Sequence, residues 1–299
     1  RADHFLAVMY CVDDKDDTFD ENTWIKANPL MTANRNIITE MRKLAIEAKS
    51  MPGRMSEFEI KRLNRRAATS KGFIRLAKWR ACGGAVDLER LRGQPCWGAF
   101  DLASTTDMNA WRLLWHVAEE DRWYTWGRFW VPEDAVKQRS ERKTINYAGW
   151  VAAGHLTMTA GDVTDYEIIE RDIIADCGRF EPRVVGYDPW NAASLANNLT
   201  NNGLPLQQFI QGPKSYNPAM KALEMVYIAG HLVHGGNPVL TWHAANLVER
   251  HDANLNIAPD RKRSADKIDG MTALIMDFGL AQADDTTAFD KYLSNPVSA

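Results

Sequence analysis

The pattern of apolar and polar positions changes near the end of the first third of the chain. From there on, three apolar runs follow one another closely, over residues 97–103, 110–117 and 122–131. Turn-forming residues separate them at 104–109 and 119–121. This close spacing predicts an antiparallel meander of three strands, which Pro132 ends.

Helical and strand patterns alternate after the meander. Four isoleucines, Ile168, Ile169, Ile173 and Ile174, have helical spacing, and Asp165 is suited to cap that helix. We then expect a short buried strand over 183–188, a helix over 192–199, a strand over 206–210, a helix after Pro218, another over 242–248 and a last one over 265–281. Three antiparallel strands followed by alternating helices and strands predict a mixed α/β sheet with the first strand central, which is the ribonuclease H-like order.

The residues before the meander predict an appended part. Residues 3–12 are mostly apolar and predict a buried strand, residues 36–48 a helix, and residues 50–80 a polar helical segment. Gly83 and Gly84 then break the chain, so we expect the main boundary between about 82 and 96. The predicted parts are residues 1–90 and residues 91–299.

Charge is unevenly distributed. The net charge of −3 gives no overall indication of a nucleic-acid partner. Residues 61–80, however, hold eight Lys or Arg and no acid, while residues 13–21 are rich in Asp and Glu. The basic run predicts either a solvated helix face or a surface that meets phosphates or another part of a motor protein.

Several classes of site are not expected. The four cysteines are scattered without a C-x-x-C pair, so neither a zinc site nor a disulfide framework is predicted, and a reducing environment fits best. His231 and His234 have no third ligand in view. No run approaches 18 apolar residues, so we expect no membrane span.

Three aspartates are the strongest chemical signal. Asp101 lies in the first strand of the meander between Phe100 and Leu102, where a carboxylate is costly unless it is paired. Asp188 ends a later strand, and Asp269 lies one turn inside the predicted last helix. The plain alternatives are a turn at Asp188 before proline and an exposed helical position for Asp269, with Asp266 as the helix N-cap.

If the three carboxylates converge, they need compensation. Two unit charges about 4 Å apart repel by about 4 kcal/mol at an effective dielectric constant of 20, and burial adds to this. Oxygen ligands without His or Cys favour Mg²⁺ or Mn²⁺ over zinc. Two such ions clamp the attacking and leaving oxygens of an in-line phosphoryl displacement, so two-metal hydrolysis is the predicted chemistry.

At these residues the chain resembles the carboxyl-terminal nuclease domain of tailed-bacteriophage terminase large subunits. The matching stretches are GAFDLASTTDMNA at 98–110, RFWVPE at 128–133, YDPWNA at 187–192 and KIDGMTAL at 267–274, with WIKANP at 24–29 upstream. The resemblance implies a ribonuclease H-like, metal-dependent endonuclease that cuts concatemeric viral double-stranded DNA during packaging.

The resemblance also implies roles for individual residues. The acidic triad of the family corresponds to Asp101, Asp188 and Asp269; Asp101 is expected to bridge two Mg²⁺ or Mn²⁺ ions, and Asp266 is a further candidate ligand. Apart from the resemblance, the charges themselves mark the residues expected to contact DNA, which are Lys267, Arg250, Arg261, Lys262 and Arg263, the last four around a predicted basic hairpin with its turn at 252–256. For Lys267 and Asp266 the plain alternative is a solvated helix start.

Partners and alternatives follow from the same comparison. The implied partners are double-stranded DNA, the portal protein and the small terminase subunit, in the host cell cytoplasm. The chain has no G-x-x-x-x-G-K-[ST] phosphate-binding loop, so we expect residues 1–90 to be the end of a motor domain and expect no ATPase activity from this chain. The alternatives are another ribonuclease H-like enzyme, such as a transposase, integrase or resolvase, and a non-catalytic module that docks onto the packaging motor.

Overall fold

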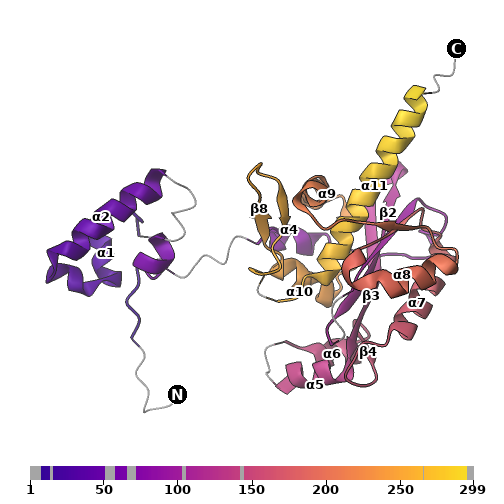
Figure 1. Cartoon of the computed structure of the whole chain (residues 1–299), viewed down its shortest axis with the longest axis horizontal. Helices are drawn as coiled ribbons and strands as arrows, with labels where there is room; N and C mark the ends of the chain where they lie inside the picture. Colours follow the sequence, from indigo (N-terminus) through magenta and orange to yellow (C-terminus); the bar gives the residue numbers. More distant parts are fainter. Residues whose placement is uncertain are drawn as a thin grey trace. The chain divides into compact units, whose positions relative to one another are not determined.

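The structure, a computed structural model, describes residues 8–13, 16–50, 58–65, 72–102, 106–141, 145–264 and 266–294. Contacts divide the chain into two units, Arg1–Lys71 and Gly72–Ala299 (Figure 1). This division lies before the predicted boundary at 82–96, because helix α4 (Leu76–Ala81) packs within the second unit. Its Trp79 is fully buried and makes an edge contact with Tyr227 at 6.2 Å.

The described part of the first unit is helical. It contains α1 (Glu21–Ala27), η1 (Pro29–Thr32), α2 (Arg35–Ser50) and a helical turn at 58–62, so the helix predicted over 36–48 is confirmed. The strand predicted over 3–12 is wrong for residues 8–12, which are not in a strand; residues 3–7 lie outside the described part. Val12 alone of these is fully buried, in a cluster with Trp24 and Phe58, and the described residues of this unit offer no strand for it to pair with.

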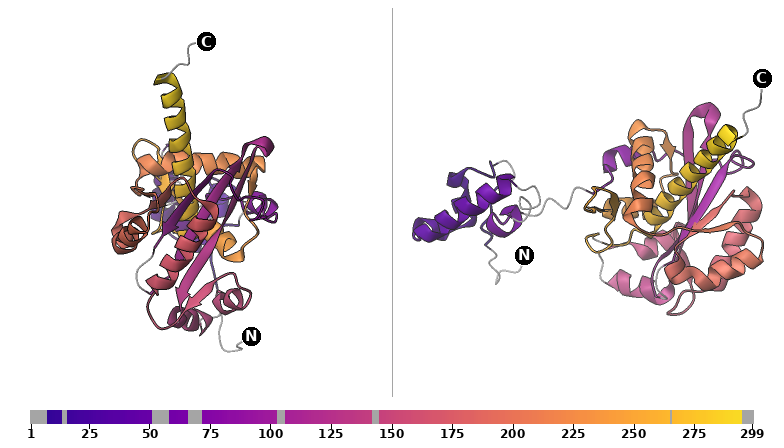
Figure 2. Two further views of the ribbon diagram at one scale, coloured as in Figure 1. Left: turned by 90° about the vertical axis from the view of Figure 1, so that its right-hand side faces the viewer. Right: turned by 45° about the horizontal axis from the view of Figure 1, so that its top comes forward.

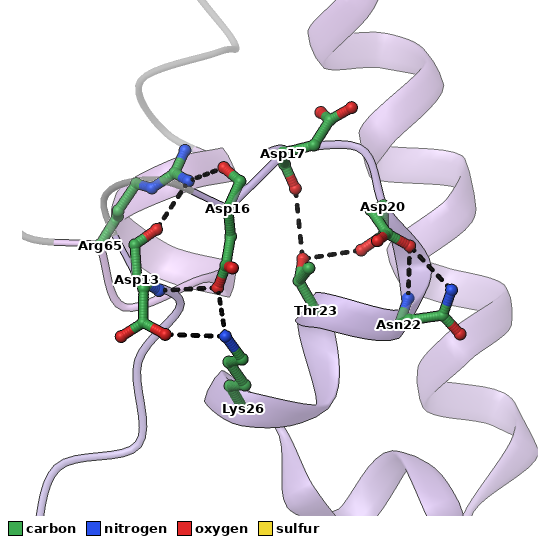
Figure 3. A network of polar contacts seen from close by, with 8 residues as sticks. All are labelled: Asp13, Asp16, Asp17, Asp20, Asn22, Thr23, Lys26 and Arg65. Atoms are coloured by element: carbon green, nitrogen blue, oxygen red, sulfur yellow. Dashed lines mark hydrogen bonds and ion pairs between the residues drawn. The ribbon is translucent and has the colours of Figure 1, made fainter.

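Two of the acidic residues of this unit, Asp13 and Asp16, are held by basic ones. Lys26 Nζ lies 2.7 Å from both Asp13 Oδ2 and Asp16 Oδ2, and Arg65 donates to the backbone carbonyls of Asp13 and Asp16 (Figure 3). Asp20 caps α1 through the backbone N–H of Asn22.

The basic run predicted over residues 61–80 is divided between the two units. Lys61, Arg62 and Arg65 belong to the first unit, and Arg75, Lys78 and Arg80 belong to the second. Residues 66–71 of the run lie outside the described part.

The second unit is built on a mixed sheet with the order β4-β3-β2-β1-β5-β6, in which β7 also pairs with β3. The strands are β1 (Cys96–Asp101), β2 (Asn109–Val117), β3 (Arg122–Pro132), β4 (Thr157–Thr159), β5 (Val185–Tyr187), β6 (Leu206–Gln208) and β7 (Leu232–Val233). The three meander strands pair antiparallel, and β5 then pairs parallel to β1. The predicted ribonuclease H-like sheet with a central first strand is therefore confirmed.

Helices cover both faces of this sheet (Figure 1 and Figure 2). Alternate residues of β1 point to opposite faces: Trp97 and Ala99 pack with α9 (Pro213–Ala229), α10 (Pro238–Asn246) and α11 (Asp269–Ser294). Phe100 packs on the other face with α7 (Tyr166–Phe180) and α8 (Pro189–Asn201). Because both faces are covered, every residue of β1 is buried, including its terminal aspartate.

The helix boundaries differ from the predictions at several places: α10 is Pro238–Asn246 rather than 242–248, and α8 begins at Pro189 rather than at 192. Helix α9 was expected after Pro218 but begins at Pro213, so Pro218 lies inside the helix. Helix α11 begins at Asp269, where the N–H of Thr272 bonds the carbonyl of Ile268 at 2.9 Å. The predicted start at residue 265 was therefore too early. Asp269 is the first helical residue, and Asp266 lies outside the helix.

The remaining elements frame the sheet. α5 (Glu133–Glu141) and α6 (Tyr147–Ala152) follow the meander, η2 (Ala118–Glu120) joins β2 to β3, and β8 (Glu249–His251) pairs with β9 (Ile257–Pro259) as the predicted hairpin. Asp165 caps α7 as predicted. All four cysteines are free. Among the described residues, no helix combines the length and apolar character needed to cross a bilayer.

Candidate active site

Two of the three predicted aspartates lie at the same edge of the sheet. The parallel register of β1 and β5 places Phe100 opposite Tyr187, so Asp101, which ends β1, and Asp188, which directly follows β5, come next along the two strands. Asp101 is almost fully buried, while Asp188 is partly exposed and caps α8 by accepting from the backbone N–H of Trp190 at 3.1 Å.

The third aspartate comes to this edge through α11. This helix packs against β1, β2 and β5, and its first residue is Asp269. The side chain is 5% exposed, and its Oδ2 atom has no hydrogen-bond partner in the described structure. A buried carboxylate oxygen without a partner is costly, so this atom is a natural ligand for a cation.

The charges of these carboxylates are coupled. Burial, with a further contribution from the negative charge of Asp101, raises the pKa of Asp269 to about 7. Burial also raises the pKa of Asp101, with a smaller contribution from Asp188, while Arg261 opposes both effects. Asp101 therefore lies in the negative field of Asp188 and repels Asp269, so this edge favours any nearby cation.

Arg261 provides that cation in the structure. Its Nη2 atom lies 2.6 Å from Asp101 Oδ2 and 3.2 Å from Gln211 Oε1, and the Gln211 amide donates to Asp101 Oδ1 at 3.4 Å. The Arg261 side chain is 46% exposed, whereas the Asp101 side chain is 2% exposed. Arg261 thus reaches from solvent to a carboxylate at the bottom of the site.

Two cavities meet at Arg261. One, of about 270 Å³, is lined by Arg139, Arg261, Ser264, Asp266, Lys267, Ile268 and Asp269. The other, of about 440 Å³, is lined by Gln211, Tyr216, Arg250, Pro259, Asp260, Arg261 and Lys262. Four of the five residues predicted to contact DNA therefore line the space beside the carboxylates.

Some predicted residues have partners of their own. Asp266 pairs with Arg139 at 2.7 Å, and Lys267 pairs with Asp107. Arg263 is 63% exposed and pairs with Asp260, so it lies outside both cavity linings. Asp266 is consequently a less available metal ligand than Asp269, whose Oδ2 has no partner in the described structure.

The described residues include no group of three His, Cys, Asp or Glu side chains arranged to hold a metal ion. Asp101 and Asp269 are both buried, but Arg261 occupies one oxygen of Asp101, and Asp188 uses Oδ1 as a helix cap. The triad is thus brought to one edge of the sheet without forming a ready three-ligand cluster.

Three residues of this site were not predicted. Gln211 and Arg139 contact predicted site residues from distant elements, and no motif marked them in the sequence. His243, fully buried on α10, accepts a hydrogen bond through Nδ1 from the N–H of Gly270 at 2.9 Å and so supports the residue next to Asp269. A single histidine within an apolar helix gives no signal of such a contact.

Comparison with known proteins gives the family context of this geometry. The family model described as "Terminase large subunit, endonuclease domain" matches residues 1–285. The chain is 29% identical to the terminase large subunit of Enterobacteria phage HK97 over 99% of its own length and 58% of the relative. It is also 31% identical to protein YmfN of Escherichia coli strain K12, over 93% of this chain and 63% of YmfN.

A solved structure agrees with these matches. The crystal structure of the HK97 bacteriophage large terminase is similar with a TM-score of 0.65 and 28% identity, over 91% of this chain and 56% of that one. The chain spans about three fifths of the length of the curated relatives that it matches.

Proposed function

Because this chain belongs to the family of terminase large-subunit endonuclease domains, we propose that it hydrolyses phosphodiester bonds of double-stranded DNA with the help of divalent cations. The proposed ligands are Asp101, Asp188 and Asp269, and the proposed ions are two Mg²⁺ or Mn²⁺. The biological substrate would be concatemeric viral DNA, cut during genome packaging.

One observation carries this proposal. Asp101 and Asp269 are both buried at the sheet edge where Asp188 also lies. Burial raises the pKa of each carboxyl group, and the charge of Asp101 also raises the pKa of Asp269, so a nearby positive charge would stabilise both ionised forms. A fold does not normally bury neighbouring carboxylates unless cations or protons compensate them. The three positions are the end of a strand, the N-cap of α8 and the first residue of α11, and such elements hold ligands more rigidly than loops do.

The residues fit divalent metal ions in their chemistry. The donors are carboxylate oxygens without His or Cys, and Asp269 Oδ2 has no other partner in the described structure. Bound divalent ions would supply positive charge to both the attacking and the leaving oxygen of the phosphodiester. Arg261 would have to release Asp101 Oδ2 for that oxygen to act as a ligand.

The chain's own basic residues would position the substrate. Arg261, Lys262 and Arg250 line one cavity, and Arg139 and Lys267 line the other, so cations flank the carboxylates on two sides. Such residues bind phosphates and carry no base information. Cleavage is therefore expected to show little dependence on base identity.

Plasmid cleavage tests the proposal. With Mn²⁺ and supercoiled plasmid, the wild-type chain should nick and linearise DNA, and EDTA should stop the reaction. Asp101→Asn and Asp269→Asn should each lose cleavage at least about 100-fold. Asp121→Asn is the matched control, since Asp121 is exposed in the β2–β3 turn at the other end of the meander and has φ 50°, which Asn tolerates. Full activity in either site variant, with native circular dichroism, would refute the assignment.

The other functions considered from the sequence carry less support. The family match favours a terminase over a transposase, integrase or resolvase. We also propose, from family membership alone, that DNA, the portal protein and the small terminase subunit are partners of the full-length protein in the host cytoplasm. Residues 1–90 as the end of a motor domain, and the lack of ATPase activity in this chain, remain predictions.

A further inference from the structure

One tryptophan differs from all the others in its exposure. Trp190 is 87% exposed, whereas the other ten tryptophans of the chain are buried or partly buried. An isolated exposed apolar side chain needs no explanation in general. Trp190, however, lies two residues after Asp188, at the edge of the sheet that carries the candidate active site.

The backbone of Trp190 is fixed relative to Asp188. Pro189 occupies the first position of α8, and the N–H of Trp190 donates to Asp188 Oδ1 at 3.1 Å. The first turn of a helix has no preceding turn to cover its side chains. The backbone of Trp190 is thus held beside a candidate metal ligand, and its side chain is open to solvent.

A second exposed apolar residue lies at the same edge. Strands β5 and β6 are parallel, with Tyr187 opposite Gln208; Ile210 is the second residue after β6, and Trp190 is the third after β5. Ile210 is 72% exposed, and its neighbour Gln211 donates to Asp101. An exposed apolar side chain therefore follows each of the neighbouring strands β5 and β6. Beside each of them is a polar residue of the candidate active site, Asp188 after β5 and Gln211 after β6.

The chemistry of this edge indicates which ligand the indole meets. The basic residues that line the cavities suit phosphates. An exposed indole two residues from Asp188 suits the faces of bases. Apolar wedges that enter a base step partly unstack it and bend the duplex. Resting on the proposed nuclease function, we propose that Trp190 wedges into a base step of the DNA next to the scissile phosphate.

This contact would give cleavage a preference that no base-edge hydrogen bond provides. Pyrimidine–purine steps unstack more easily than other steps, so a wedge favours them through their deformability. Cuts by the wild-type chain should therefore be enriched at such steps, although base identity is not read directly. Removal of the indole should remove this enrichment.

The test compares Trp190→Ala, Trp190→Phe and Met225→Ala in the whole chain. Met225 is the control, because it is 66% exposed but lies near the far end of α9 from Ile210. Two measurements are made: the Kd for a labelled duplex by fluorescence anisotropy in EDTA, and the positions and rates of Mn²⁺-dependent cuts in linear DNA. Trp190→Ala should weaken binding and lower kcat/KM by about 10-fold, Trp190→Phe by about 3-fold or less, and Met225→Ala should match the wild type.

A duplex with one mismatched base pair sharpens the result. The mismatch is already partly unstacked, so it should restore cutting by Trp190→Ala near that position. The rise in melting temperature with Mn²⁺ should be the same in Trp190→Ala and wild type, because the indole is not a metal ligand. Equal Kd, equal rates and equal cut positions in Trp190→Ala and wild type would overturn the wedge and leave the indole as a contact for another protein surface. Absence of cleavage by the wild type would refute the nuclease proposal, and the EDTA binding data would still decide whether Trp190 touches DNA.

Discussion

Arg261 and Asp101 form a 2.6 Å ion pair between a half-exposed guanidinium and a buried carboxylate. Burial raises the pKa of Asp101, and Arg261 is the largest influence that lowers it again. Arg261 therefore stabilises the ionised form of Asp101, which burial would otherwise disfavour.

Arg261→Met should destabilise the chain in the absence of metal. The loss leaves Asp101 buried without its cation, which for a pair with one exposed member should cost about 1–3 kcal/mol at pH 8. Thermal unfolding in EDTA measures it. Arg263→Met is the control, since Arg263 is 63% exposed and its loss should cost less than about 1 kcal/mol. Mn²⁺ should raise the melting temperature of Arg261→Met more than that of the wild type; an unchanged melting temperature in EDTA would contradict the role assigned to this ion pair.

Asp269 should make the metal-free chain less stable as the pH rises. Its pKa is raised from 3.8 to about 7 by burial, so the folded state keeps a proton that the unfolded state has already lost. This contribution is present in full below pH 3.8 and is lost as the pH rises to about 7. Asp269→Asn cannot ionise, so its stability relative to wild type should grow by about 2–4 kcal/mol between pH 4 and pH 8. Urea unfolding in EDTA at both pH values measures this; a pH-independent difference would show that Asp269 ionises normally.

His243 should stabilise the start of α11 through its acceptor nitrogen. His243→Leu removes the acceptor for the Gly270 N–H and should cost about 1–3 kcal/mol at pH 7, whereas His243→Asn can keep an acceptor near the same place and should cost less. Urea unfolding gives both values. Equal losses in the two variants would indicate that only the volume of the ring matters.

The same histidine should contribute to acid sensitivity. Burial lowers the pKa of His243 from 6.5 to about 3, so the unfolded state takes up a proton before the folded state does. Its contribution to stability is present above pH 6.5 and is lost as the pH falls toward 3. The opposite trend of Asp269 partly cancels it in wild type, so the loss is best measured in the Asp269→Asn background. There, His243→Asn should flatten the fall in stability between pH 6.5 and 5.

Gly127 should be irreplaceable within the meander. A Cβ atom there would lie 2.0 Å from the backbone oxygen of Trp111 on the neighbouring strand, and backbone cannot move aside as a side chain can. Gly127→Ala should therefore destabilise the second unit by more than about 3 kcal/mol or prevent folding. Gly178→Ala is the matched control, because nothing lies within 4 Å of its Cβ position in α7, and it should stabilise by about 0.5–1 kcal/mol. Thermal unfolding of both variants measures these changes in stability. Equal melting temperatures for the two variants would contradict the steric role of Gly127.

The sheet was predictable because its signal is local. The meander has closely spaced apolar runs with clear turns, and Asp165 and the isoleucines of α7 show a capped, amphipathic helix. The strand predicted over residues 3–12 shows the limit of such signals. An apolar run indicates burial, but a strand also needs a neighbouring strand for its backbone hydrogen bonds. The apolar run does not show whether the fold provides that neighbour.

The carboxylates show the same division. The sequence marks Asp101 as a candidate site residue because a charge within an apolar strand is costly. Its burial is confirmed by the structure. The boundary of α11 placed Asp269 at the first helical residue rather than one turn inside, and the pairing of Asp266 with Arg139 joins segments far apart in the chain. Neither fact has a short-range cause.

Local patterns were enough to predict the antiparallel meander, the alternation of helices and strands after it, the three aspartates and the family that they resemble, because periodicity, turn residues and the cost of a buried charge all act over a few neighbouring residues. Only the folded chain shows that Arg261 and Gln211 hold Asp101, that His243 supports the start of α11, and that the indole of Trp190 faces solvent. These depend on long-range packing of the sheet edge, where parallel register and the docking of α11 bring together side chains that no local pattern connects.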